Sequence, residues 1–128
     1  MGRENIVVGN TGEGAALTFL RARGYKIVGT NVCTPFGELD IVARRKGFVV
    51  FVEVKTRASY SLGPPYLSVT GRKAQKIIQN SLFWLVKNDL YGADWRIDVV
   101  SVRLNSDLSV KDIELFENAI EGDYGGYT

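Results

Sequence analysis

The sequence predicts an α/β fold in which helices flank a central β-sheet. The first observation is residues 37–57, which alternate as two β-strands joined by a tight turn at residues 46–47. The second is that the later strand, residues 48–55, is apolar on both faces, which is typical of a strand inside a sheet covered on both sides. The third is helical periodicity on either side of this strand pair, over residues 10–23 and 71–91.

The remaining elements follow from capping and turn residues. Gly24 and Gly92 are expected to end the two helices, and Thr70 to cap the second one. Residues 113–120 fit either a helix or a strand. With no linker or repeat, residues 1–128 are expected to form one domain. In chain order we expect a loose lead-in over 1–9, a helix over 10–23, a strand over 25–32, the strand pair over 37–57, a loop over 58–70, a helix over 71–91, a strand over 95–103 and a loose end over 122–128.

Composition limits the chemistry that is available. The 128 residues contain no histidine, so any hydrolysis must use carboxylates, lysine and a metal ion. The single cysteine, Cys33, excludes an internal disulfide and a cysteine-rich zinc site. Without a membrane-length apolar run or a signal peptide, a cytoplasmic protein is expected. The net charge of +2 divides into +7 over residues 1–104 and −5 over residues 105–128. The basic body fits a phosphate-binding surface, but an acidic tail that merely keeps the protein soluble explains the same distribution.

Acids and a lysine share one face of the strand pair. Side chains alternate along a strand, so Asp40 belongs to one face of its strand, and Glu53 and Lys55 to one face of theirs. A two-residue turn at 46–47 places Asp40 opposite Glu53, and Glu38 opposite Lys55. A four-residue loop keeps all four on one face, whereas a three-residue loop with a bulge separates them. Neighbouring carboxylates repel unless a proton or a cation lies between them, and Mg²⁺ commonly uses one or two carboxylates.

Four further features allow both a functional and an ordinary explanation. Glu13 lies on the apolar stripe of the first helix, but its spacing from Asn10 also fits a capping box. Lys73 opens the second helix, where a cation suits either a bound phosphate or a solvated face. The basic residues 44–46 fit a DNA contact or a solvated turn. Asp98 interrupts an apolar strand and is interpreted as structural rather than as a metal ligand.

The order of these residues resembles a known pattern. Asp40 followed by Glu53-Val54-Lys55 is similar to the PD-(D/E)xK motif of restriction-endonuclease-like nucleases. A longer ordered set, from about Gly9 to Ile120, resembles the YraN-type bacterial family, which is similar in layout to archaeal Holliday-junction resolvases. This set consists of Gly12-Glu13, Ala16, Leu20, Gly24-Tyr25, Asn31, Gly37-Glu38, Asp40-Ile41, residues 51–57 and Asp98-Val99-Val100.

The resemblance implies a restriction-endonuclease-like fold, with a mixed sheet of four to five strands and a short edge strand within 113–120. It also implies a metal-dependent DNA endonuclease that hydrolyses phosphodiester bonds, with branched or repair and recombination intermediates as candidate substrates. Asp40 and Glu53 would hold Mg²⁺ or Mn²⁺, with the backbone carbonyl of Val54 as a third ligand.

The same resemblance implies roles for the surrounding residues. Glu13 would be a further ligand or act through a water on the cation, and Lys55 would position and activate the attacking water. Thr56, Arg57 and Lys73 would contact backbone phosphates. DNA is the implied partner, and the likeness to resolvases suggests a homodimer. Two competing hypotheses are a nucleic-acid-binding module that kept the fold without catalysis, and a partly buried ion network without a metal.

Overall fold

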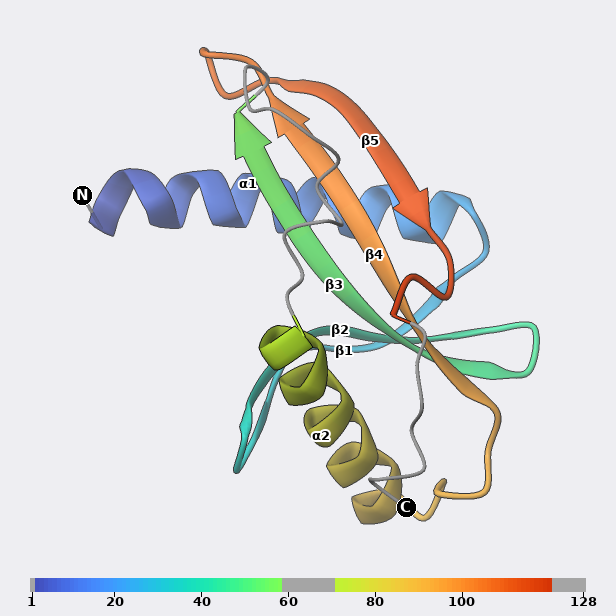
Figure 1. The fold of residues 1–128 in the computed structure, drawn as a ribbon. Coiled ribbons are helices and arrows are strands. Elements are labelled where there is room, and N and C mark those ends of the chain that lie inside the picture. Colours follow the sequence, from blue (N-terminus) through green and yellow to red (C-terminus); the bar gives the residue numbers. More distant parts are fainter. Residues whose placement is uncertain (1, 59–70, 121–128) are drawn as a thin grey trace.

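Five β-strands form one mixed sheet with a helix packed on each face (Figure 1). The computed structural model describes residues 2–58 and 71–120. The strands lie in the order β1-β2-β3-β4-β5, with β3 and β4 parallel and the other neighbours antiparallel. The predicted α/β fold with a mixed sheet is therefore confirmed. The elements are α1 (Gly2–Ala22), β1 (Lys26–Thr34), β2 (Gly37–Arg45), β3 (Phe48–Ala58), α2 (Gly71–Lys87), β4 (Trp95–Leu104) and β5 (Val110–Phe116).

The central strand β3 is buried on both faces, as its sequence predicted. Val50 and Val52 belong to a core that also contains Leu20 of α1. Their neighbour Phe51 points the other way, into a second core that contains Leu85 of α2. In Figure 1, α1 crosses β3, β4 and β5, whereas α2 packs on the half of the sheet formed by β1 and β2. Each face of the sheet is thus covered by a different helix.

The first helix is longer than expected. It begins at Gly2, so the prediction of a loose lead-in over residues 1–9 is wrong for residues 2–9. Asparagine commonly caps helices, which favours a start at Asn10, but no proline interrupts the preceding residues and the helix continues through Asn10. The predicted end is confirmed: Gly24 has a φ of +88°, and the Tyr25 N–H donates to the Leu20 carbonyl at 3.0 Å.

The second helix is shorter than expected. It ends at Lys87 rather than at residue 91, and Asp89 rather than Gly92 supplies the left-handed residue, with a φ of 56°. The Leu90 N–H donates to the Leu85 carbonyl at 2.7 Å, which is the bond that closes a Schellman motif. Aspartate can adopt this conformation, so the glycine was not needed as the stop.

The C-terminal part of the described chain is a strand. β5 covers Val110–Phe116, so of residues 113–120, which the sequence left open between helix and strand, 113–116 are strand and 117–120 are neither. It lies at the edge of the sheet beside β4, as the resemblance implied. The predictions for the loop over 59–70, for Thr70 as a cap and for the end over 122–128 lie outside the described residues.

The sheet opens between β2 and β3. Residues 46–47 form the predicted two-residue turn, with φ values of 48° and 84°, and Arg45 pairs with Phe48. The ladder between the strands ends at the pair of Ile41 and Val52, although both strands continue. Figure 1 shows β1 and β2 turning away from β3 beyond this pairing. The next residues on the two strands are the acids that the sequence singled out.

Candidate catalytic site

Asp40 lies where β2 separates from β3. Its Oδ2 accepts a hydrogen bond from the backbone N–H of Val54 at 2.9 Å. The carboxylate thereby accepts a hydrogen bond from a backbone N–H of β3 that lies beyond the last backbone pair between β2 and β3. This contact holds the side chain across the opening and brings it beside Glu53, which precedes Val54 on β3.

The carboxylate of Glu53 forms ion pairs with two lysine ammonium groups. Lys55 Nζ lies 3.7 Å and Lys73 Nζ 3.2 Å from the same oxygen, Oε1. Lys55 shares a face of β3 with Glu53, whereas Lys73 comes from the first turn of α2. The side chains of Glu53 and Lys55 are 12% and 17% exposed, but that of Lys73 is 41% exposed. Lys73 therefore lies on the solvent side of the group.

Burial and mutual charge shift the protonation of these side chains. Burial, reinforced by the adjacent Glu53 carboxyl, raises the pKa of Asp40 to about 7. Burial and the neighbouring Lys73 lower the pKa of the Lys55 ammonium. Burial alone would lower the pKa of Lys73, but its contacts with Lys55 and Glu53 outweigh burial and raise it. Asp40 and Glu53 form an acid pair that favours a shared proton or a bound cation.

Glu13 approaches this opening from α1. The helix passes so close to β3 that a Cβ atom added to Gly12 would lie 1.9 Å from Thr56 Oγ1. Only glycine allows this approach without a shift, and it positions the turn that carries Glu13. Since α1 continues through Asn10, Glu13 lies inside the helix, and the capping-box explanation for this acid is wrong.

The carboxyl group of Glu13 is incompletely satisfied. Its Oε1 is buried and has no hydrogen-bond partner among the described residues. Burial raises the pKa of Glu13, a hydrogen bond with Asn31 opposes this shift, and the charge of Glu38 adds to it. The charge of Glu13 also contributes to the raised pKa of Asp40, so the two acids interact across the opening. A buried unpartnered oxygen is costly unless it binds a ligand.

These residues fit a small divalent cation, although they do not form a complete cage. No three Asp, Glu or Cys side chains within the described ranges are grouped closely enough to enclose a metal. Mg²⁺ does not need such a cage, because it commonly binds through one or two carboxylates and keeps several waters. A cation at Asp40 and Glu53 would relieve the repulsion that raises the pKa of Asp40. It or its water could also satisfy Oε1 of Glu13.

Three other predicted residues lie around this group. Glu38 is exposed and interacts through its charge with Glu13, whereas the Lys55 amine that it was expected to face is paired with Glu53. Thr56 packs against α1, on the face of β3 opposite to Lys55. Arg57 lies further along β3, opposite Arg103 of β4. The phosphate contacts expected of Thr56 and Arg57 stay predictions.

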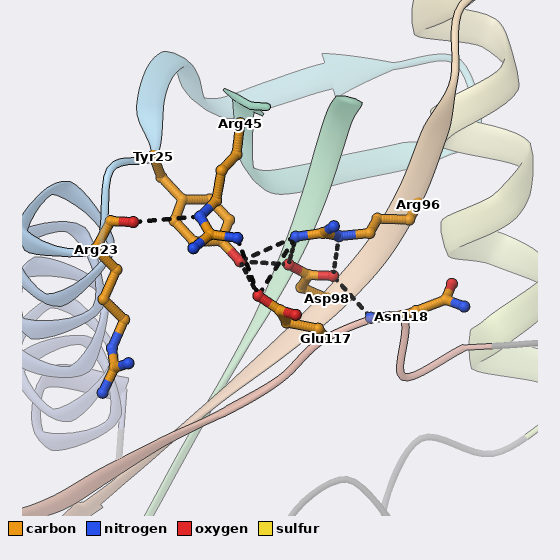
Figure 2. Close-up of polar contacts among 7 residues, drawn as sticks. All are labelled: Arg23, Tyr25, Arg45, Arg96, Asp98, Glu117 and Asn118. Atoms are coloured by element: carbon orange, nitrogen blue, oxygen red, sulfur yellow. Dashed lines mark hydrogen bonds and ion pairs between the residues drawn. The ribbon is translucent and has the colours of Figure 1, made fainter. Parts of the chain in front are cut away.

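Asp98 belongs to a separate polar network (Figure 2). It is fully buried and accepts hydrogen bonds from the Tyr25 hydroxyl at 2.7 Å, from Arg96 Nε at 3.0 Å and from the Asn118 N–H at 2.8 Å. Burial and the Asp98 carboxylate raise the pKa of Tyr25. These contacts join β4 to the start of β1 and to the chain after β5, which supports the structural interpretation of Asp98.

The hairpin tip contributes to this second network. Arg45 Nη1 pairs with Glu117 at 3.3 Å, and its Nε donates to the Arg23 carbonyl at 3.2 Å. The guanidinium carbon lies 5.1 Å from the centre of the Tyr25 ring. Sequence reasoning missed the network, although the placement of Arg96 and Asp98 two residues apart on one strand face was a usable signal.

Comparison with known proteins identifies the family. The profile of the uncharacterised protein family UPF0102 matches residues 12–102. The chain belongs to the UPF0102 family. This confirms the YraN-type family predicted from the order of the motifs. The matched range contains all of the residues grouped at the sheet opening, namely Glu13, Glu38, Asp40, Glu53, Lys55 and Lys73.

UPF0102 proteins from several bacteria resemble this chain along nearly its whole length. The protein of Trichlorobacter lovleyi is 43% identical over 122 residues, covering 94% of this chain and 95% of the relative. The protein of Geotalea uraniireducens is 42% identical over 118 residues, covering 92% of both chains. That of Persephonella marina is 36% identical over 118 residues, covering 92% of this chain and 97% of the relative.

In the part of the chain that the structure describes, no helix is long and apolar enough to cross a membrane.

Proposed function

We propose that this UPF0102 protein is a metal-dependent nuclease that hydrolyses phosphodiester bonds in DNA. The observation that carries the proposal is the meeting of Asp40, Glu53 and Lys55 where β2 and β3 separate, with the unpartnered Oε1 of Glu13 at the same opening. This combination of two acids, a lysine and an incompletely satisfied carboxylate supports phosphodiester chemistry better than a structural ion pair, which would leave no acceptor unsatisfied.

Asp40 and Glu53 are the residues that would hold Mg²⁺ or Mn²⁺. When bound, such a cation would neutralise the acid pair and would stabilise the negative charge that develops on the phosphate. The chain's own residues supply the remaining steps. Lys55 orients the attacking water and donates to a phosphate oxygen, and Glu13 Oε1 accepts the water's proton. The new P–O bond forms as the bond to the leaving oxygen breaks, and the leaving oxygen takes a proton from solvent water.

The surrounding cations would position the nucleic acid without reading its sequence. Lys73 lies on the solvent side of the acid pair, at the N-terminus of α2, where the helix dipole also attracts phosphate. Arg57 lies two residues after Lys55 on the same strand, β3. Branched or repair and recombination intermediates are the proposed substrates, and a homodimer is the proposed assembly for a four-way junction, since two strands must be cut.

The test is cleavage of a labelled panel that comprises a four-way junction, a flap, a single strand, a linear duplex and RNA. Wild-type protein is assayed with Mg²⁺, with Mn²⁺ and with EDTA, beside the Glu53→Gln and Lys55→Ala variants. Glu114→Gln, an exposed acid of β5, is the matched control. We expect metal-dependent products that disappear in both site variants and persist in the control.

Two outcomes would contradict the proposal. Equal cleavage by all proteins would indicate a contaminating nuclease. The other outcome is DNA binding that weakens with salt and does not depend on the cation, with no cleavage of any substrate. This result would favour the alternative of a nucleic-acid-binding module that kept the fold without catalysis.

A further inference from the structure

One carboxylate oxygen of Glu53, Oε1, is paired with two lysines in this structure. Lys73 Nζ lies 3.2 Å from Oε1, closer than Lys55 Nζ at 3.7 Å. A divalent cation bound to this oxygen would sit at about 2.1 Å from it. An ammonium group at its present position would then lie against a doubly charged ion, so the two cannot be held together without strong repulsion.

The two lysines differ in their freedom to move away. Lys55 extends from the central strand β3 and its side chain is 17% exposed. Lys73 extends from the first turn of α2 and its side chain is 41% exposed. A lysine side chain has a four-carbon flexible stem, so its ammonium can leave one partner and reach another several ångströms away without movement of the helix. Lys73 is the lysine that can be displaced.

We propose that Lys73 is a positioning residue that exchanges between Glu53 and a substrate phosphate as the divalent cation binds and leaves. The inference rests on the proposed function, which places the cation at Glu53. In the cation-free protein, Lys73 neutralises Glu53 and ties the first turn of α2 to β3. In the loaded protein, Lys73 is released toward the solvent side and contacts the DNA backbone.

Two consequences separate this exchange from a fixed ion pair. First, Lys73 competes with the cation, so its removal should tighten cation binding. Second, its contribution to DNA binding should depend on the cation, because only a released ammonium can reach a phosphate. A lysine that merely supports the fold would produce neither effect, and a lysine that always faces DNA would contribute equally with and without the cation.

The first experiment measures Mn²⁺ binding by calorimetry with the full chain. Wild type is compared with Lys73→Met and with Lys76→Met, which removes the same charge from an exposed position one turn further along α2. We expect the Kd for Mn²⁺ to fall about fivefold in Lys73→Met, the size expected for loss of a partly exposed ion pair, and to stay within about twofold in Lys76→Met. Urea unfolding should show Lys73→Met to be less stable than wild type without Mn²⁺ and equal to it at saturation. An unchanged Kd in Lys73→Met overturns the inference.

The second experiment measures affinity for a labelled DNA junction in Ca²⁺, which should occupy the site without supporting cleavage, and in EDTA. Lys73→Met should weaken binding about tenfold in Ca²⁺ and less than about twofold in EDTA, whereas Lys76→Met should have the same effect in both. Equal losses in both buffers for Lys73→Met overturn the exchange.

The outcome for Glu53→Gln shows which statement has failed. If wild type does not bind Mn²⁺, or if Glu53→Gln binds it equally well, the proposed metal site is wrong and the inference fails with it. If Glu53→Gln abolishes binding while Lys73→Met behaves as wild type, the metal site stands and only the exchange is wrong.

Discussion

Replacement of Asp40 by asparagine should stabilise the protein above neutral pH. The carboxyl of Asp40 is buried beside Glu53, and its pKa is raised from 3.8 to about 7. A folded state that holds a proton more tightly than the unfolded chain loses stability as the pH rises between these two values. An amide does not titrate, and its oxygen can still accept the 2.9 Å hydrogen bond from the Val54 N–H. The free energy of unfolding of the variant therefore does not fall when the pH rises through the pKa of Asp40.

The size of the effect follows from the shift. Each pKa unit corresponds to about 1.4 kcal/mol, so the full difference of about three units gives about 4 kcal/mol at pH 8 and above. At pH 5 the folded carboxyl is protonated while the unfolded one is mostly ionised, and the difference falls to about 2 kcal/mol. At pH 4 it is less than about 1 kcal/mol. The advantage of the variant should thus grow steadily from pH 4 to pH 7 and then level off.

Urea unfolding followed by tryptophan fluorescence measures this difference directly. Trp84 and Trp95 both pack against the core beneath α2, so their emission should report loss of the folded state. Wild type and Asp40→Asn are compared at pH 4, 5, 6, 7 and 8 at constant ionic strength. Asp94→Asn, an exposed acid before β4, is the matched control and should change the free energy of unfolding by less than about 0.5 kcal/mol at every pH.

A destabilised Asp40→Asn protein at pH 8, or a difference that does not vary with pH, would refute the interpretation of Asp40 as a strained buried acid. Addition of Mg²⁺ at pH 8 gives a second readout. It should raise the stability of wild type and leave Asp40→Asn nearly unchanged, because the variant lacks one of the two proposed ligands.

Four further substitutions should test the packing and charge of the molecule by urea unfolding. Glu13→Gln should raise the free energy of unfolding by up to about 1 kcal/mol at pH 8, because it removes the charge from a half-buried carboxyl group whose Oε1 has no partner; a loss of stability would show that this oxygen is satisfied. Gly12→Ala should cost about 2 kcal/mol, since its Cβ would clash with β3, whereas Gly14→Ala, with no atom within 4 Å, should gain about 0.5–1 kcal/mol; equal effects would contradict the close approach of α1. Asp98→Asn should cost about 3 kcal/mol, because Arg96 would lose its buried counter-ion, and a neutral result would mean that the network in Figure 2 is dispensable.

Much of the sheet could be predicted because its signals are local. Alternation placed Asp40 and Glu53 on the faces they occupy, and the two-residue turn at 46–47 set the pairing of Arg45 with Phe48. Gly24 ended α1 as expected, since a left-handed residue is needed there. Local signals mislead where tertiary packing or the neighbouring sequence overrides them. Asn10 resembled a cap but lies inside α1.

The sequence by itself determined the α/β class, the tight turn that joins β2 to β3 and the identity of the acids and lysine on these two strands. The tertiary structure decided that the ladder ends beside Asp40, that α1 brings an unsatisfied Glu13 to the opening, and that Lys73 of α2 binds Glu53 rather than facing solvent alone. Turns and alternation depend on neighbours in the chain, which the sequence displays. Burial, pKa shifts and ion pairs depend on which distant elements meet, and that is set by the packing of the two helices on opposite faces of the sheet.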